Sequence, residues 1–406
     1  MKPVKRFTIP MTHHRIGGNA MKKLTPVVAL TCVFMLACCF VIFGATANDL
    51  VKKLGLTDTQ WSLVPALFLY TACVVQIFIG AITDKIGHKP VAIAGFIVTA
   101  ASMFLIVSAG SVGTLYAAAL CLGVGAMSLN TVGNTIIPQV LFGGKDPARA
   151  SNFGNGFFGL GLMVTPLIIQ YAPSIQTGLM VLGALNGVFL ILALMADYPA
   201  ARLGYRFKTA LGLLGQKPVL IAALALLCYV GLENSMSNWT SRLMNELYTA
   251  TGAADPARSA AVVLSLFGLS IMIGRFIASA VKNLTAIGIR VLAAVSAVSV
   301  VTLLFLYTAK SPALAIAAVI LTGLAFAPVF PTILGVTFGQ YQPQYYGSIF
   351  GIIFAVGLFG GGLLQNLIGS MAGRSVQSGF IVLAVTAVLM LAVALSMGRV
   401  KKPAAG

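Results

Sequence analysis

The chain has 406 residues, of which 59% are hydrophobic and only 8% are charged. A soluble protein of this length needs far more charge on its surface, so the composition excludes a soluble globular fold. The formal net charge of +18 would suit a nucleic-acid partner. The cations, however, lie in short clusters between apolar runs and form no basic face, which excludes nucleic acid. The predicted partner is the lipid bilayer, and no soluble domain is left to make the chain an enzyme.

Twelve apolar segments are long enough to cross a bilayer as helices. They lie at about 26–47, 60–82, 90–109, 112–141, 151–171, 177–196, 218–238, 259–281, 289–308, 312–339, 346–368 and 377–397. The first also resembles a secretory signal ending at Ala45-Thr-Ala47, but an apolar stretch of about 20 residues favours a spanning helix. The predicted fold class is an all-α membrane protein with 12 transmembrane helices.

The longest connection divides these segments into six and six. The predicted organisation is a tail over 1–25, a six-helix bundle over 26–198, a linker over 199–217, a second six-helix bundle over 218–397 and a tail over 398–406. Nineteen of the 26 Lys and Arg residues fall on the side of the tails and linker, and six fall on the other side. Because Lys and Arg concentrate in cytoplasmic loops, we predict a multi-pass protein of the cytoplasmic (inner) membrane with both termini cytoplasmic.

The cysteines and histidines follow no metal-ligand spacing. The six cysteines are Cys32, Cys38, Cys39, Cys73, Cys121 and Cys228, all inside apolar segments and none in a Cys-x-x-Cys pair. The histidines are His13 and His14 in the first tail and His88 in a loop. The sequence therefore predicts no metal site, no disulfide framework and no cofactor.

The polar side chains embedded in the predicted helices are mostly amides. The candidates for solute binding are Asn130 and Asn134 in span four, Asn155 in span five, Asn234 and Asn238 in span seven, and Gln365 and Asn366 in span eleven. An amide offers both donors and acceptors, which suits a neutral polyhydroxylated solute. For each of these residues the alternative is a hydrogen bond between helices.

Glu233 is an acid deep within an apolar run, in the stretch Tyr229-Val-Gly-Leu-Glu233. At 100° per residue, Tyr229 and Glu233 share one face of span seven, and Asn234 and Asn238 adjoin that face. Such a polar face normally lines the interior of a helix bundle or a water-filled path. Burial favours the protonated acid, so Glu233 is a candidate for solute binding or proton coupling, and a hydrogen-bonded structural acid is the alternative.

Arg275 is the other ionisable residue within the spans. At 1.5 Å per residue, Glu233 lies about 22 Å from the cytoplasmic end of its helix and Arg275 lies about 9 Å from the cytoplasmic end of its own. A depth difference of about 13 Å predicts that the two side chains do not meet. Arg275 is then a structural charge near the cytoplasmic surface.

A charged motif follows the second predicted helix and reads Gly80-Ala-Ile-Thr-Asp84-Lys85-Ile-Gly87-His88-Lys89. It resembles the signature G-x-x-x-D-[RK]-x-G-[RK]-[RK] of the major facilitator superfamily. The resemblance implies two pseudo-symmetric six-helix bundles that work by alternating access, with these charges and glycines as a conformational latch. A glycine permits close helix approach, and an acid such as Asp84 suits a helix N-terminus. The second half has only a degenerate counterpart of the motif, at 274–283, and it has no acid at the position that corresponds to Asp84.

Within that superfamily the chain resembles the family of L-fucose/proton symporters and glucose/galactose transporters. The stretches that carry the resemblance are 125–134, 151–156, 229–233, 330–333 and 360–362. Where those symporters have an acid in span four, this chain has Asn130. Their acid at the outer end of span one falls near Lys52, with Asp49 three residues earlier as a second candidate for coupling.

The sequence thus predicts a secondary active or facilitative transporter of a small neutral polar solute, sugar-like, coupled to a proton or sodium ion or to neither. We expect a monomer. The alternative is a proton-driven exporter of drugs or metabolites. Span five, which reads Gly159-Leu-Gly161-Leu-Met-Val-Thr-Pro166, lacks the G-P-x-x-G-G ending typical of drug/proton antiporters and disfavours this alternative.

Overall fold

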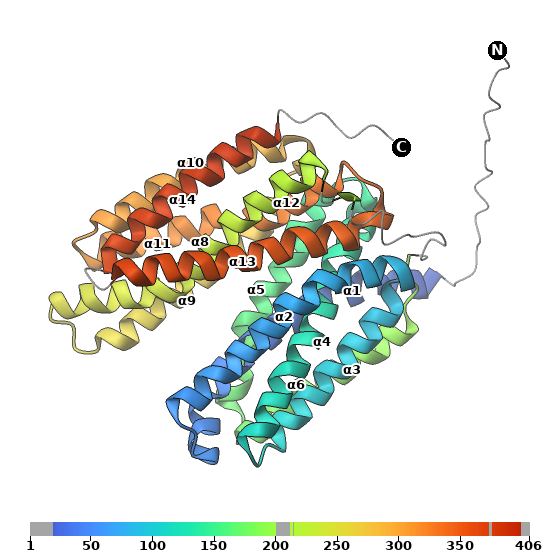
Figure 1. Cartoon of the computed structure of the whole chain (residues 1–406), viewed down its shortest axis with the longest axis horizontal. Helices are drawn as coiled ribbons and strands as arrows, with labels where there is room; N and C mark the ends of the chain where they lie inside the picture. Colours follow the sequence, from blue (N-terminus) through green and yellow to red (C-terminus); the bar gives the residue numbers. More distant parts are fainter. Residues whose placement is uncertain (1–18, 200–211, 214, 373–375, 399–406) are drawn as a thin grey trace.

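The chain folds into long helices arranged as two bundles (Figure 1). The computed structural model describes residues 19–199, 212, 213, 215–372 and 376–398. Within these ranges twelve helical stretches are long and apolar enough to cross a membrane, and there is no strand. The predicted all-α membrane fold with twelve spans is confirmed.

Each half contributes six of the spans. The first half consists of α1 (Asn19–Leu54), α2 (Asp58–Ile86), α3 (His88–Val107), α4 (Val112–Val140), the short 3-10 turn η1 (Leu141–Gly144), α5 (Pro147–Tyr171) and α6 (Ile175–Met195). The second half consists of α8 (Lys217–Ala250), α9 (Pro256–Ala280), α10 (Leu284–Thr308), α11 (Pro312–Phe326), α12 (Val329–Phe338), η2 (Pro343–Tyr345), α13 (Tyr346–Ala372) and α14 (Val376–Met397).

Serine residues begin several helices after short turns. The side chains of Ser111, Ser174 and Ser311 accept hydrogen bonds from backbone N–H groups at the starts of α4, α6 and α11. Each bond satisfies a donor that the first helical turn leaves unpaired. The short turns keep successive helices antiparallel, so each half packs around an apolar core of its own.

The two halves approach each other most closely near the end of the molecule where α1 begins and α14 ends, called the closed end below. A side-chain carbon placed on Gly80 of α2 would lie only 2.0 Å from the carbonyl oxygen of Gly347 in α13. One placed on Gly335 of α12 would lie 2.1 Å from the Cα of Ala148 in α5. Toward the opposite end, called the open end, the two bundles diverge (Figure 1).

The helices differ from the predicted spans in length and continuity. Both α1 and α8 extend well past the predicted apolar segments. The tenth span is interrupted at Ala327 and Pro328, so it forms two helices, α11 and α12. Most of the predicted linker, residues 200–211 and 214, lies outside the described residues, so the boundaries of the two bundles stay a prediction.

Contact between the glycines predicts that a bulky side chain at position 80 prevents closure of this end. Gly80→Leu should therefore shift the protein toward a state that is closed at the other end. Spin labels at Gly110 and Ala254, exposed positions on opposite halves at the open end, should then move closer together in a background without the native cysteines. Gly183→Leu is the control, because a side-chain carbon at Gly183 meets nothing within 4 Å. An unchanged distance distribution in Gly80→Leu would contradict the prediction.

Candidate functional site

The middle of α8 presents a partly exposed polar face. This helix packs against α9, α13 and α14, while Asn234 and Asn238 remain exposed and Glu233 and Ser237 are half-buried. The side-chain hydroxyl of Ser237 donates to the Glu233 carbonyl at 2.9 Å. A polar face of this kind normally lines the interior of a helix bundle or a water-filled path.

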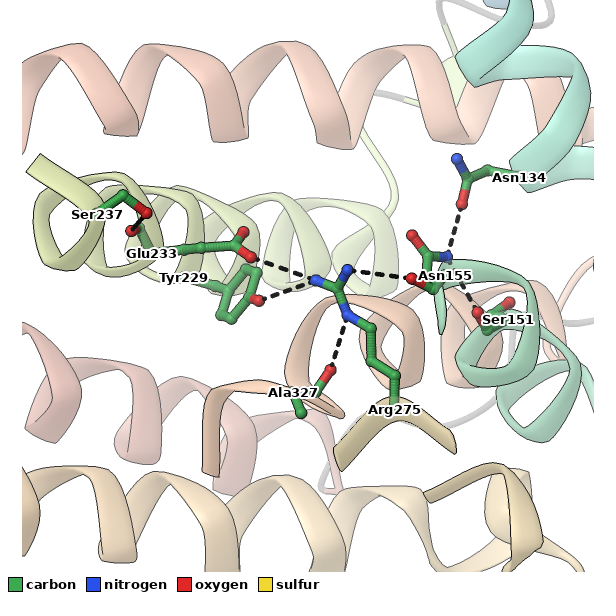
Figure 2. A network of polar contacts seen from close by, with 8 residues as sticks. All are labelled: Asn134, Ser151, Asn155, Tyr229, Glu233, Ser237, Arg275 and Ala327. Carbon is green, nitrogen blue, oxygen red and sulfur yellow. Dashed lines mark hydrogen bonds and ion pairs between the residues drawn. The ribbon is translucent and has the colours of Figure 1, made fainter. Parts of the chain in front are cut away.

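Arg275 of α9 forms an ion pair with Glu233, in contrast to the prediction from depth. An Nη of Arg275 lies 3.2 Å from Oε1 of Glu233 (Figure 2). The prediction was wrong because it compared the positions of the backbones only. Side chains on a helix lean toward the helix N-terminus. Since α8 and α9 run in opposite directions, Glu233 leans toward the closed end and Arg275 leans toward the open end, and the two side chains meet.

The guanidinium of Arg275 contacts three further groups. It donates to the hydroxyl of Tyr229 at 3.5 Å, to the carbonyl of Asn155 at 3.3 Å and to the carbonyl of Ala327 at 3.3 Å (Figure 2). The side chain of Arg275 is only 3% exposed, whereas that of Glu233 is 26% exposed. The acid therefore lies between the buried cation and the accessible face of α8, and the pair carries no net charge.

The contact between Arg275 and Ala327 follows from a proline. In a continuous helix the Ala327 carbonyl would accept a hydrogen bond from the N–H of residue 331. Position 331 is Pro331, which has no N–H. A buried carbonyl requires a donor, and the Nε of Arg275 supplies it. Arg275 therefore holds the break between α11 and α12 as well as the ion pair.

The other contact of Arg275 reaches the first half of the chain, where the predicted amides form one network. Asn155 donates to the side chain of Asn134 at 3.0 Å, Asn134 donates to that of Asn130 at 2.8 Å, and Asn130 donates to Gln76 at 3.3 Å. All four side chains are buried. In this conformation these amides join α2, α4 and α5, and none is open to a solute. Gln76 was missed, although it is an amide in the middle of the apolar stretch of α2.

Asp84 of the charged motif lies against the N-terminus of α13, across the boundary between the halves. Its carboxylate accepts bonds from the backbone N–H groups of Gly347 at 2.9 Å and Ser348 at 2.6 Å, and from the Ser348 hydroxyl at 2.6 Å. A carboxylate at a helix N-terminus is stabilised by the unpaired N–H groups and the helix dipole.

The remaining residues of the motif shape the connection between α2 and α3. Gly87 has a φ of 91°, which a residue without a side chain adopts at no steric cost. Lys85 is exposed, and Lys89 donates to the carbonyl of Ala196 at 3.3 Å, just after α6 ends. His88, in the place of a basic residue, is buried against Thr135, with Nε2 3.0 Å from the hydroxyl.

Other predicted site residues lie apart from the ion pair. Asp49 is exposed near the open end of α1. Gln365 and Asn366 lie within α13, but their side chains are outside the described part of the structure. In that part no group of three His, Cys, Asp or Glu residues could hold a metal ion.

The chain matches the model of the Major Facilitator Superfamily over residues 29–365. It belongs to this superfamily, whose members are membrane transporters of small solutes and are not enzymes.

Solved structures with the same fold include several transporters. A crystal structure of FucP in the outward conformation has a TM-score of 0.78, 18% identity and coverage of 92% of this chain and 98% of that one. A variant of this E. coli fucose:proton symporter has a TM-score of 0.73, with 18% identity and coverage of 92% and 99%. The human organic anion transporter MFSD10 has a TM-score of 0.72, 14% identity and coverage of 92% and 99%. At these identities the likeness shows the fold alone.

Curated relatives match over shorter segments. The "Probable nitrate transporter NarT" of Staphylococcus carnosus is 31% identical over 147 residues, 36% of either chain. The "Multidrug resistance protein MdtL" of Vibrio parahaemolyticus is 27% identical over 187 residues, 42% of this chain and 46% of its own. The chain thus spans less than half the length of each of these relatives.

The geometry of the ion pair predicts that losing both charges costs less stability than the sum of the two single losses. Arg275→Gln leaves the Glu233 carboxylate without its partner, and Glu233→Gln leaves the buried guanidinium unpaired, which costs up to about 3–5 kcal/mol for a fully buried pair and less here because Glu233 is partly exposed. Each single variant should lower the melting temperature, and the double variant should lower it by less than the sum.

The measurement is thermal unfolding of the purified protein in detergent. Arg242→Gln serves as a control, because Arg242 is an exposed cation on the same α8. Strictly additive changes in the double variant would show that the two charges do not stabilise each other.

Proposed function

We propose that this transporter moves a small neutral polar solute, sugar-like in its hydroxyl groups, and binds it at the polar face of α8. The observation that carries the proposal is the ion pair of Glu233 and Arg275, which cancels the charge of the cation buried at the site. A neutral solute with hydroxyl groups can pair with the carboxylate and with the amides of Asn234 and Asn238 without leaving a buried charge unpaired.

The first half supplies an aromatic surface near this site. The ring of Phe158 in α5 lies 5.9 Å from the guanidinium carbon of Arg275, and it also packs edge-on against Phe40 of α1. Aromatic rings cover the apolar faces of a solute, while polar groups on the other side fix its orientation. A solute with one polar and one apolar face, such as a sugar ring, fits this pairing of surfaces.

Glu233 is the residue we propose for coupling to a proton. Protonation of the carboxylate would remove the charge that holds the Nη of Arg275, and Arg275 also donates to Asn155 in the first half. A change in the charge of Glu233 would therefore alter a contact between the halves, as alternating access requires. Asn130, at the position of the coupling acid in related symporters, is neutral and hydrogen-bonded.

Asp84 is proposed to hold the closed end until the transporter reverses. Its three bonds to the start of α13 join the two halves, and they have to break before this end can open. Because Lys and Arg are in excess on this side, we propose that the closed end is cytoplasmic and that both termini lie there, with the protein in the inner membrane. We further propose that the protein acts as a monomer and imports the solute from the open, outer end.

A screen of solutes tests the proposed class. Neutral sugars and polyols should raise the melting temperature of the purified protein, because a ligand that binds only the folded state stabilises it by mass action. Amino acids, nitrate, organic anions and lipophilic cations should have no such effect. Stabilisation by lipophilic cations alone would favour the alternative, a proton-driven exporter of drugs or metabolites, to which the similarity with MdtL also points. Stabilisation by anions alone would contradict the neutral class.

Replacement of Glu233 tests the proposed coupling once a solute has been found. In proteoliposomes Glu233→Gln should abolish accumulation driven by a proton gradient and retain exchange of solute between the two sides, because the uncharged side chain no longer carries a proton. Glu246→Gln is the matched control, since Glu246 is an exposed acid on the same helix. Undiminished accumulation in Glu233→Gln would remove Glu233 from the coupling step.

A further inference from the structure

The connection between α4 and α5 contains an acid that crosses to the second half of the molecule. The carboxylate of Asp146 accepts hydrogen bonds from the backbone N–H groups of Leu284 and Thr285, each at 2.9 Å, and from the Thr285 hydroxyl at 2.6 Å. Leu284 and Thr285 are the first two residues of α10. Asp146 thus binds a helix N-terminus through the same set of groups, two N–H and one hydroxyl, that Asp84 uses at α13.

Arg149, three residues after Asp146, binds α9, the helix that precedes the turn into α10. The Nε of Arg149 donates to the carbonyl of Ser279 at 2.8 Å, in the last turn of α9. The guanidinium also lies 3.8 Å from the centre of the Phe142 ring. Phe142 has a φ of 50°, a left-handed conformation that a bulky residue rarely adopts.

The charges match the ends of both helices. Helix N-termini favour anions and helix C-termini favour cations. Asp146 lies at the N-terminus of α10, and Arg149 lies at the C-terminus of α9, so both interactions are favourable. Between them the backbone N–H of Ala148 donates to the Thr285 hydroxyl at 2.9 Å. The segment 146–149 therefore binds the α9–α10 turn at three points.

This arrangement accounts for the missing acid in the second half. The α9–α10 turn occupies the position that corresponds to the α2–α3 turn with Asp84, but it carries Lys282 and no acid. The acid comes instead from the opposite half. Both Asp84 and Asp146 belong to the first half, and the second half contributes the N-termini of α13 and α10.

We propose that Asp146 and Arg149 form a second lock of the closed end, which fastens α5 to the α9–α10 turn and has to open together with the contact of Asp84. The proposal rests on alternating access between the halves, but not on any solute or on proton coupling. The two locks share no residue, so the free-energy effects of removing them should add. Removing either lock should shift the equilibrium toward opening of this end, and removing both should open it further.

Hydrogen exchange followed by mass spectrometry tests the second lock in the full-length protein without added solute. Asp146→Asn keeps the size of the side chain but places an NH₂ group against the N–H groups of α10. Hydrogen exchange should increase about tenfold in peptides on both sides of the boundary between the two halves. This factor corresponds to the loss of one charge-assisted hydrogen bond. These are the peptides covering 148–155 of α5, 284–288 of α10 and 332–336 of α12.

The chain provides its own control, because the same sequence Asp-Pro-Ala-Arg recurs at 255–258. Asp255 accepts a bond from the N–H of Arg258 at 3.0 Å at the start of α9, as Asp146 does from Arg149 at 3.3 Å. Asp255→Asn therefore removes the charge from an equivalent helix cap at the open end. It should change hydrogen exchange only in the first turn of α9. Arg258→Gln should have the same local effect, whereas Arg149→Gln should increase exchange on both sides of the boundary between the halves.

The outcomes separate a lock from a local cap. Increased exchange in α5 and α12, greater still in the double variant Asp84→Asn/Asp146→Asn, supports the second lock. An increase confined to the first turn of α10, or one that equals the effect of Asp255→Asn, overturns it. The melting temperatures of all variants are measured in parallel. If Asp146→Asn fails to fold, Arg149→Gln provides the same comparison, since Arg149 is half-buried and its removal leaves the carboxylate at α10 in place.

Discussion

The burial of one guanidinium between the two halves is the constraint on which the arrangement of the site depends. An unpaired charge at this depth would cost several kcal/mol. Arg275 is 3% exposed, so its guanidinium requires acceptors nearby. Glu233, Tyr229, Ala327 and Asn155 supply these acceptors from three further parts of the fold. The carbonyl at the helix break, the acid in the apolar run and a backbone carbonyl of the opposite half thus all accept hydrogen bonds from a single cation.

Hydrogen-bond donors at the starts of helices provide the corresponding constraint at the closed end. The first N–H groups of a helix have no partners within it, and at the boundary between two bundles they have to be satisfied across that boundary or by water. Asp84 satisfies those of α13, and glycines at positions 80 and 347 let the helices approach closely enough for this. Opening of this end, as proposed above, would leave these N–H groups and the carboxylate to pair with water.

The fold was predictable from the sequence because the membrane imposes a simple rule on length and hydropathy. Each span had to be about 20 apolar residues, and all twelve were found. The motif from Gly80 to Lys89 likewise indicated the superfamily. The ion pair was not predictable from spacing, since it depends on the opposite lean of side chains on antiparallel helices. Gln76 and Asp146 were missed for a related reason. Each is a single polar residue whose partner lies more than 50 positions away in the chain, where no local pattern reports it.

One face of α5 connects the two constraints. Ala148, Asn152, Asn155 and Gly159 follow each other at intervals of three or four residues, so they share one side of the helix. Along this side Ala148 contacts Thr285 and Gly335. Asn152 donates to Thr332 at 3.0 Å. Asn155 accepts from Arg275, and Gly159 packs against Met272. The contacts extend over about 16 Å at 1.5 Å per residue. Because a helix transmits displacement as a rigid body, a change in the position of Arg275 that moves Asn155 also moves Ala148. The ion pair and the closed end therefore contact the same side of one helix.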